Sequence, residues 1–159
     1  MELNAADVRY LVAGGLAVVA HGYVRFTADV DLILDLESSN LTRAIAALER
    51  LGYRPRAPVA FQQFADPDKR AEWRREKGLT VFSLYSSDHA LTEVDLFVEP
   101  MIDFERAYND AVRTEVAPGV PATFIGFRDL VRLKQQAGRP QDILDIEKLT
   151  SIKNDKGHG

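Results

Sequence analysis

The run Asp29-Val30-Asp31-Leu32-Ile33-Leu34 places two acids two residues apart at the head of an apolar strand. A similar run, Val94-Asp95-Leu96-Phe97-Val98, carries one further acid. Strand side chains alternate between faces, so residues 29 and 31 are expected to point the same way, roughly 6–7 Å apart. Because an unpaired buried carboxylate costs several kcal/mol, bound divalent cations are the simplest reason for placing three acids here.

Length and composition predict one ordinary globular domain. The chain has 159 residues, 46% of them hydrophobic and 28% charged, which is enough for a single core. It has no cysteine and only three scattered histidines, so any metal would be a hard cation on oxygen ligands. The net charge of −4 argues against a long nucleic-acid track. With no membrane-length apolar stretch and no signal peptide, we expect a cytoplasmic protein.

Hydrophobic periodicity and turn residues divide the chain into alternating strands and helices. Ser38-Ser39-Asn40 offers helix caps and Gly52 a helix stop, and Ser86–His89 is expected to join two paired strands. The expected strands are residues 8–13, 29–36, 79–85, 93–98 and 122–127, and the expected helices are 16–23, 38–51, 68–77, 104–112, 128–137 and 141–149. This order predicts one α/β (α+β) domain over residues 1–152, with a small mixed β-sheet, flanking helices, a helical C-terminal third and a flexible tail at 153–159.

The expected first strand ends at Gly14-Gly15, immediately before a short helix. Glycine lets the backbone approach a phosphate without a Cβ, and a helix start directs free N–H groups at the same anion. Together with Asp29, Asp31 and Asp95 this predicts a phosphoryl-transfer site. Two Mg²⁺ ions, for which Mn²⁺ could substitute, would bridge the acids and a triphosphate and activate an attacking hydroxyl.

These residues resemble the signature of the nucleotidyltransferase superfamily, which has the polymerase-β-like fold. The pattern is Ala13-Gly14-Gly15, thirteen intervening residues, Asp29-Val30-Asp31-Leu32, and then the distant Val94-Asp95-Leu96. The resemblance implies that Asp29 and Asp31 bind both metals, and that Asp95 is the third ligand and the activator of the acceptor hydroxyl. It therefore implies that all three are catalytic.

The segment from Arg132 to Ile146 looks like a motif of the abortive-infection nucleotidyltransferase toxins and their short relatives, and the resemblance spans roughly residues 10–149. It implies that Lys134 contacts nucleotide phosphate and that Asp145 is a further functional acid. Arg25 and Thr27, just before the acidic strand, are candidates for binding the triphosphate, although Arg25 could equally pair with an acid. Gly15 stands where this branch commonly has Ser, which leaves only its backbone N–H for the phosphate.

Several residues have a structural interpretation as well as a functional one. His21 is expected to be a packed or capping residue, and Trp73 a cover over the core in preference to a base-stacking platform. Asp142 and Asp145 fall in the first turn after Pro140, where acids favour the helix dipole in any case. Arg139 is their expected ion-pair partner.

The favoured function is Mg²⁺-dependent transfer of a nucleoside monophosphate from an NTP to a hydroxyl. The acceptor is open between RNA such as a tRNA end, a protein side chain, and a small molecule such as an aminoglycoside or lincosamide. A toxin–antitoxin role would add a cognate antitoxin, and a second copy of the chain is another candidate partner. The alternatives are a non-catalytic nucleotide-binding or interaction module of the same fold and an antibiotic nucleotidyltransferase; a metal-dependent phosphoesterase is disfavoured because histidines do not cluster.

Overall fold

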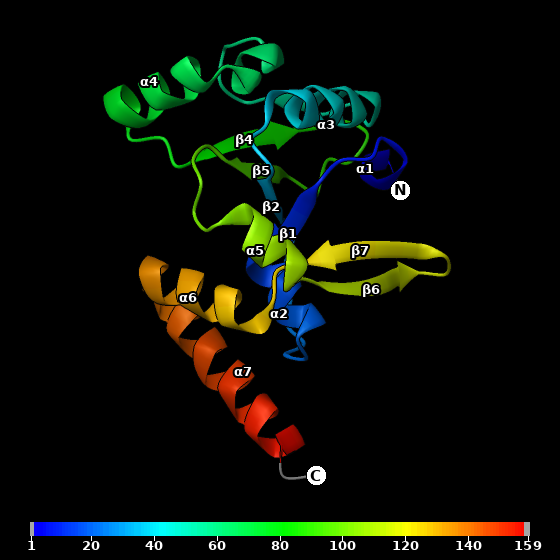
Figure 1. The fold of residues 1–159 in the computed structure, drawn as a ribbon, viewed down its shortest axis with the longest axis vertical. Coiled ribbons are helices and arrows are strands. Elements are labelled where there is room, and N and C mark those ends of the chain that lie inside the picture. The colour runs from blue at the N-terminus through cyan, green and yellow to red at the C-terminus, as the bar shows by residue number, and fades with distance from the viewer. Residues whose placement is uncertain (1, 158–159) are drawn as a thin grey trace.

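The structure is a computed structural model that describes residues 2–157. Its strands are β1 (Tyr10–Ala13), β2 (Val30–Leu34), β3 (Arg54–Pro55), β4 (Val81–Tyr85), β5 (Val94–Phe97), β6 (Val112–Ala117) and β7 (Val120–Phe124). Its helices are α1 (Glu2–Ala5), α2 (Gly14–Ala20), α3 (Ser38–Arg50), the 3₁₀-helix η1 (Phe61–Ala65), α4 (Pro67–Lys77), α5 (Phe104–Asn109), α6 (Phe127–Ala137) and α7 (Pro140–Gly157). Figure 1 shows α3 and α4 at one end of the long axis and α6 and α7 at the other, with the sheet between them.

All seven strands form one mixed sheet in the order β3-β4-β5-β2-β1-β7-β6. At its centre β2 runs parallel to β5 and antiparallel to β1. The register places Asp31 opposite Asp95 on one side and opposite Ala13 on the other. The C-terminal end of β1 therefore lies beside the N-terminal ends of β2 and β5. The glycines and acids of the sequence signature come together at this end of the central strands.

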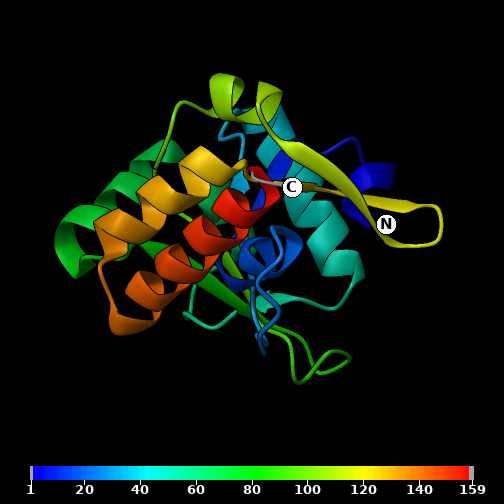
Figure 2. The same cartoon turned by 90° about the horizontal axis from the view of Figure 1, so that it is seen from below.

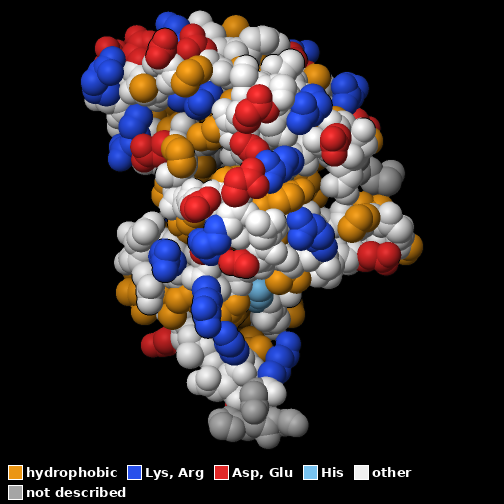
Figure 3. Space-filling view, viewed as in Figure 1, with side chains coloured by type: hydrophobic (Ala, Val, Ile, Leu, Met, Phe, Trp, Pro, Cys, Tyr) orange, Lys and Arg blue, Asp and Glu red, His pale blue; other side chains and the backbone are white. Residues whose placement is uncertain are grey.

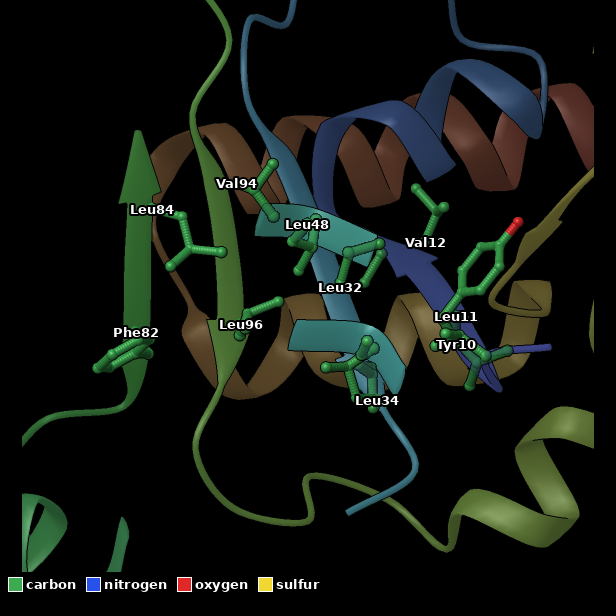
Figure 4. Close-up of a cluster of buried hydrophobic side chains, with 14 of the residues drawn as sticks. Tyr10, Leu11, Val12, Leu32, Leu34, Leu48, Phe82, Leu84, Val94 and Leu96 are labelled. Atoms are coloured by element: carbon green, nitrogen blue, oxygen red, sulfur yellow. The ribbon is translucent and has the colours of Figure 1, made fainter. Parts of the chain in front are cut away.

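The core lies under the central strands, whose apolar side chains are closed to solvent. Leu11 and Leu96 are fully buried, and Figure 4 shows Leu48 of α3 lying over Leu32 and Val94. Trp73 of α4 is 7% exposed and stacks on Phe82 with ring centroids 5.1 Å apart. Trp73 is thus the expected core cover, and the strand pair β4–β5 is confirmed by its antiparallel register.

The helix ends follow local sequence chemistry, with one correction. The carboxylate of Glu37 accepts hydrogen bonds from the backbone N–H groups of Ser39 and Asn40, so Glu37 is the cap of α3 in place of the expected Ser38-Ser39-Asn40. Asn40 is instead buried, and its side-chain amide donates to the carbonyls of Arg9 and Asp35. The Asn40 amide therefore ties the chain before β1 to the chain after β2.

The helix expected over residues 16–23 is α2 at Gly14–Ala20, the strand expected over 122–127 is β7 at Val120–Phe124, and three further differences are larger. The helix expected over residues 104–112 ends at Asn109, and Val112–Ala117 forms β6, a strand that the sequence reading missed. The hairpin of β6 and β7 stands out from the body of the molecule (Figures 1 and 2). The tail expected to be flexible from residue 153 continues as α7 to Gly157, and residues 158–159 lie outside the described part. Within residues 2–157, no helix combines the length and apolarity needed to cross a bilayer.

Candidate active site

Asp31 and Asp95 form the centre of the candidate site. They lie directly opposite each other on parallel neighbouring strands, which are about 4.8 Å apart in a sheet. Ser83 of β4 donates a hydrogen bond of 2.7 Å from Oγ to Oδ1 of Asp95. The sequence analysis missed Ser83, although a small polar residue between Phe82 and Leu84 of an apolar strand was a signal for it. This bond fixes one acid of the pair from the adjacent strand.

Asp29 differs in position from the other two acids. β2 begins at Val30, so Asp29 precedes the strand, and its side chain is exposed. It still lines the same cleft as Asp31 and Asp95. Among residues 2–157, however, no three acidic or histidine side chains lie in an arrangement that could hold a metal ion as they stand. Asp29 would have to turn inward for the predicted three-acid set to form.

Two glycines leave open the space beside Asp31. Gly14 has a φ of +62°, and a Cβ on it would lie 1.9 Å from Oδ2 of Asp31. A Cβ on Gly15 would lie 2.4 Å from Oγ1 of Thr27 and 2.9 Å from its Cβ. Thr27 therefore occupies the volume that a side chain at position 15 would need. The hydroxyl at this wall of the cleft is therefore that of Thr27 and not of a serine at position 15.

A network of ion pairs continues this wall from Arg25, whose guanidinium lies 3.3 Å from the Cβ position of Gly15. Asp145, which is fully buried, accepts two hydrogen bonds from the Arg25 guanidinium, at 2.9 and 2.8 Å, and one from Gln141 at 2.8 Å. Lys134 Nζ lies 2.8 Å from Asp145 and 3.1 Å from Asp142. Arg139 is bound to Asp142 through Nε at 2.7 Å. The expected partnership of Arg139 is therefore with Asp142, and Arg25 is the partner of Asp145.

The pKa of Asp31 is shifted in the opposite direction from those of Asp142 and Asp145. Burial, followed by the charges of Asp95 and Asp29, raises the pKa of Asp31 to about 6, although Lys134 and Arg139 oppose this shift. Burial also acts to raise the pKa of Asp145, but hydrogen bonds from Arg25, Lys134 and Gln141 outweigh it and hold that pKa below its usual value. The pKa of Asp142 is lowered in the same way. Of these three acids, Asp31 is thus the one whose ionised form is disfavoured by its surroundings.

Two cavities meet at the acids. One of about 320 Å³ is polar, and its lining includes Gly14, Gly15, Arg25, Thr27, Asp29, Asp31, Asp95 and Lys134. The other, of about 410 Å³, shares Asp31, Asp95 and Lys134 but extends between apolar side chains of β4, β5 and α6, including Val81, Phe97, Met101, Leu130, Leu133 and Ala137. The site therefore has a charged side and an apolar side, separated by the carboxylate pair.

The structure thus brings eight of the nine residues singled out in the sequence to one cleft. The ninth, Asp145, lines neither cavity and lies behind Arg25 and Lys134 as their buried counter-ion. His21 is packed, as expected, with Nε2 2.8 Å from the carbonyl oxygen of Ile125 and its ring against Phe127. The apolar cavity had no recognisable signal in the sequence because its walls come from three separate segments.

No protein-family model matches the chain, and no curated protein sequence matches it either. Solved structures do match. The lincosamide antibiotic adenylyltransferase LnuA, bound to lincomycin, aligns with a TM-score of 0.59 at 16% identity, over 94% of this chain and 90% of that one. The antibiotic-resistance factor ANT(2'')-Ia aligns in its solution structure with a TM-score of 0.57 at 18% identity, over 98% of this chain and 83% of that one. In complex with adenylyl-2''-tobramycin it aligns with a TM-score of 0.53 at 16% identity, over 98% and 88%. What this chain shares with these enzymes is the nucleotidyltransferase fold.

Proposed function

We propose that this protein transfers a nucleoside monophosphate from an NTP to a hydroxyl group of a small molecule and releases pyrophosphate. The observation that carries the proposal is the Asp31–Asp95 pair, in register on adjacent strands and directly beside the Gly14-Gly15 turn. A glycine turn without side chains and two adjoining carboxylates is what a polyphosphate and its cations require. The fold shared with adenylyltransferases supports the same reading.

The polar cavity is the proposed site of the triphosphate. Here the backbone of Gly14 and Gly15 is accessible at close range, and the Thr27 hydroxyl and the Arg25 guanidinium line the same wall. Lys134 contributes a positive charge held in place by Asp142 and Asp145. Charge-assisted hydrogen bonds from such groups to phosphate oxygens are among the stronger polar contacts in proteins.

The charge balance of the cleft supports the predicted use of metal ions. Three cationic side chains, Arg25, Lys134 and Arg139, face five carboxylates when Asp142 and Asp145 are included. This excess of negative charge would repel a polyphosphate unless cations entered with it. Asp31 and Asp95, with Asp29 turned inward, would hold Mg²⁺ or Mn²⁺. When bound, these ions would neutralise the phosphate oxygens and make the acceptor hydroxyl more acidic.

The proposed transfer forms one bond and breaks another. The acceptor oxygen attacks the α-phosphorus as the α–β phosphoanhydride bond breaks, and pyrophosphate leaves with that bond's electron pair. The proton of the acceptor hydroxyl passes to the carboxylate of Asp95, whose Oδ1 is fixed by Ser83. Arg25 and Lys134 stabilise the negative charge that develops on the leaving pyrophosphate.

The apolar cavity favours a small acceptor over RNA or a protein side chain. A volume of about 410 Å³ lined by Val81, Phe97, Met101 and Leu133 fits the apolar part of a compact molecule. The fold neighbours are described as bound to lincomycin and to a tobramycin product, so small hydroxylated antibiotics are reasonable first acceptors to try. A toxin–antitoxin role and a cognate antitoxin stay predictions from the sequence resemblance.

The test is label transfer from α-³²P-labelled NTPs with Mg²⁺, offered a lincosamide, an aminoglycoside, total RNA or a protein lysate in parallel reactions. We expect label on a small molecule, with a loss of about 10³-fold or more in Asp31→Asn and Asp95→Asn. Asp68→Asn is the control, because Asp68 is an exposed acid on α4. Label on RNA or protein instead would overturn the acceptor class. NTP binding without any transfer by the wild type would favour the non-catalytic module.

A further inference from the structure

The two edges of the sheet differ in how they are protected. One edge is β3, a strand of two residues, Arg54 and Pro55, that offers almost no free backbone. The other edge is β6, which has six residues, Val112–Ala117, and contains neither proline nor lysine. An unprotected edge strand presents a row of unpaired N–H and C=O groups that another strand can pair with. Within residues 2–157, β6 is the longer of the two edges, and its part before the register shift at Glu115–Ala117 offers backbone groups for such pairing.

β6 is also fully accessible. All six of its residues are exposed, with Val112 at 41% and Val116 at 59%. The hairpin projects from the body of the molecule (Figures 1 and 2), with Asn4 of α1 donating a hydrogen bond to the Pro121 carbonyl of β7, and hydrophobic and acidic side chains both appear on its surface (Figure 3). Contact of these exposed valines with water is unfavourable, so a partner that covers them lowers the free energy.

The sequence of β6 is complementary to itself. Val112-Arg113-Thr114-Glu115-Val116 has opposite charges placed symmetrically about Thr114 and valines placed symmetrically outside them. If two copies pair antiparallel about Thr114, Arg113 of each lies opposite Glu115 of the other, and Val112 lies beside Val116, the extra residue at which β6 departs from regular register. Opposite charges and β-branched residues directly across two antiparallel strands are favourable pairs. A shift of this register by two residues would lose the charge pairing, so the pattern selects one alignment.

We propose that β6 is a self-association edge, at which a second copy of this chain pairs antiparallel through residues 112–116 and joins the two sheets into one. This proposal is independent of the chemistry at the acids, since β6 lies at the far edge of the sheet from β5. The register shift between Glu115 and Ala117 limits the regular part of the strand. The interface is therefore short, and the dimer forms in a concentration-dependent way.

The test measures molar mass by sedimentation equilibrium over a hundredfold range of protein concentration. The wild type is expected to rise from the 17.8 kDa of one chain towards twice that value. Glu115→Arg leaves two arginines opposite two arginines and is expected to stay at one chain throughout. Arg113→Glu is expected to do the same, although it also removes the contact of Arg113 with Tyr108, where the guanidinium carbon lies 4.8 Å from the ring centroid.

Two controls distinguish a loss of pairing between chains from damage to the hairpin itself. The double variant Arg113→Glu/Glu115→Arg restores the complementary pattern and is expected to regain the wild-type mass. The two single variants, each monomeric alone, are expected to associate when mixed, because acidic positions then face basic ones. A wild type that remains at one chain at every concentration overturns the proposal. So does a dimer that Glu115→Arg leaves unchanged.

Discussion

Two pairs of partly or fully buried acids lie within the same site, and they differ in what surrounds them. Asp142 and Asp145 are enclosed by Arg25, Lys134 and Arg139, and their pKa values are lowered. Asp31 and Asp95 face each other across two strands, with one hydroxyl, that of Ser83, as a hydrogen-bond donor. Burial alone is therefore a poor guide to function. An acid whose charge is balanced supports the structure, whereas Asp31 and Asp95 are where we propose that a cation binds.

The largest expected effect is a loss of stability on replacing an acid of the charge-balanced pair, Asp142 and Asp145. Asp145→Asn leaves Arg25 and Lys134 without a carboxylate, so we expect a loss of about 3–5 kcal/mol in the free energy of unfolding, measured by urea denaturation at pH 7.5. The stabilisation from Asp145 is present at neutral pH and is lost as the pH falls through its lowered pKa. Asp155→Asn, an exposed acid on the same helix, should change little. Equal losses in the two variants would contradict the comparison.

Asp31→Asn is expected to increase the free energy of unfolding, in contrast to Asp145→Asn. The pKa of Asp31 rises from an ordinary 3.8 to about 6 on folding, so ionisation destabilises the folded state progressively between those values and fully above about 6. Without metal, in a chelator at pH 8, the variant should be more stable than wild type by about 1–3 kcal/mol. The gain should vanish below about pH 4, where both states carry the proton. A variant less stable than wild type at pH 8 would show that Asp31 is already compensated.

Gly14→Ala tests whether Asp31 is held against the glycine turn. The new Cβ would meet Asp31 Oδ2 at 1.9 Å in a backbone of φ +62°, and we expect a loss of about 1–2 kcal/mol in thermal or urea unfolding. Gly78→Ala is the matched control, because Gly78 has a φ of +61° and nothing within 4 Å of its Cβ position. The loss of stability in Gly78→Ala measures the backbone strain alone. The excess at Gly14 should shrink in the double variant Gly14→Ala/Asp31→Ala, and an excess that persists would place the clash elsewhere.

The smallest expected loss of stability comes from Gln141, a neutral side chain that bonds to Asp145. Gln141→Ala removes one hydrogen bond of 2.8 Å to Asp145 but leaves both of its cations, so we expect a loss of about 0.5–1.5 kcal/mol in urea unfolding. Gln135→Ala, an exposed glutamine on α6, is the control. A loss as large as that of Asp145→Asn would mean that the amide, and not the ion pairs, keeps Asp145 in place.

The cleft could be predicted from the sequence because its main residues lie next to strong local patterns. Asp31 and Asp95 sit in short apolar runs, and Gly14-Gly15 follows another, so strand alternation and turn chemistry were enough to bring them together. β6 was missed because its six exposed residues bury no face, and the hydrophobic signal that defines a strand is weak there.

Long-range partners were beyond prediction. Arg25 and Asp145 are 120 residues apart, and nothing in either neighbourhood indicates the other. Asp145 was expected to be a functional acid, and only the three-dimensional packing shows that it lies behind the cleft. The apolar cavity was equally unpredictable from the sequence. Leu133 and Phe97 have the pattern of ordinary core residues, and their shared cavity is evident only once α6 is placed against the sheet.

The bond between Arg25 and Asp145 also bears on how the protein is made. A ribosome releases the glycines, the loop carrying Arg25, and both acidic strands well before it releases α7. Until Asp145 emerges, Arg25 and Lys134 lack their counter-ion, and the wall they form cannot be fixed in place. The charged wall of the cleft is therefore completed only after residue 145 has left the ribosome, later than the glycines and both acidic strands.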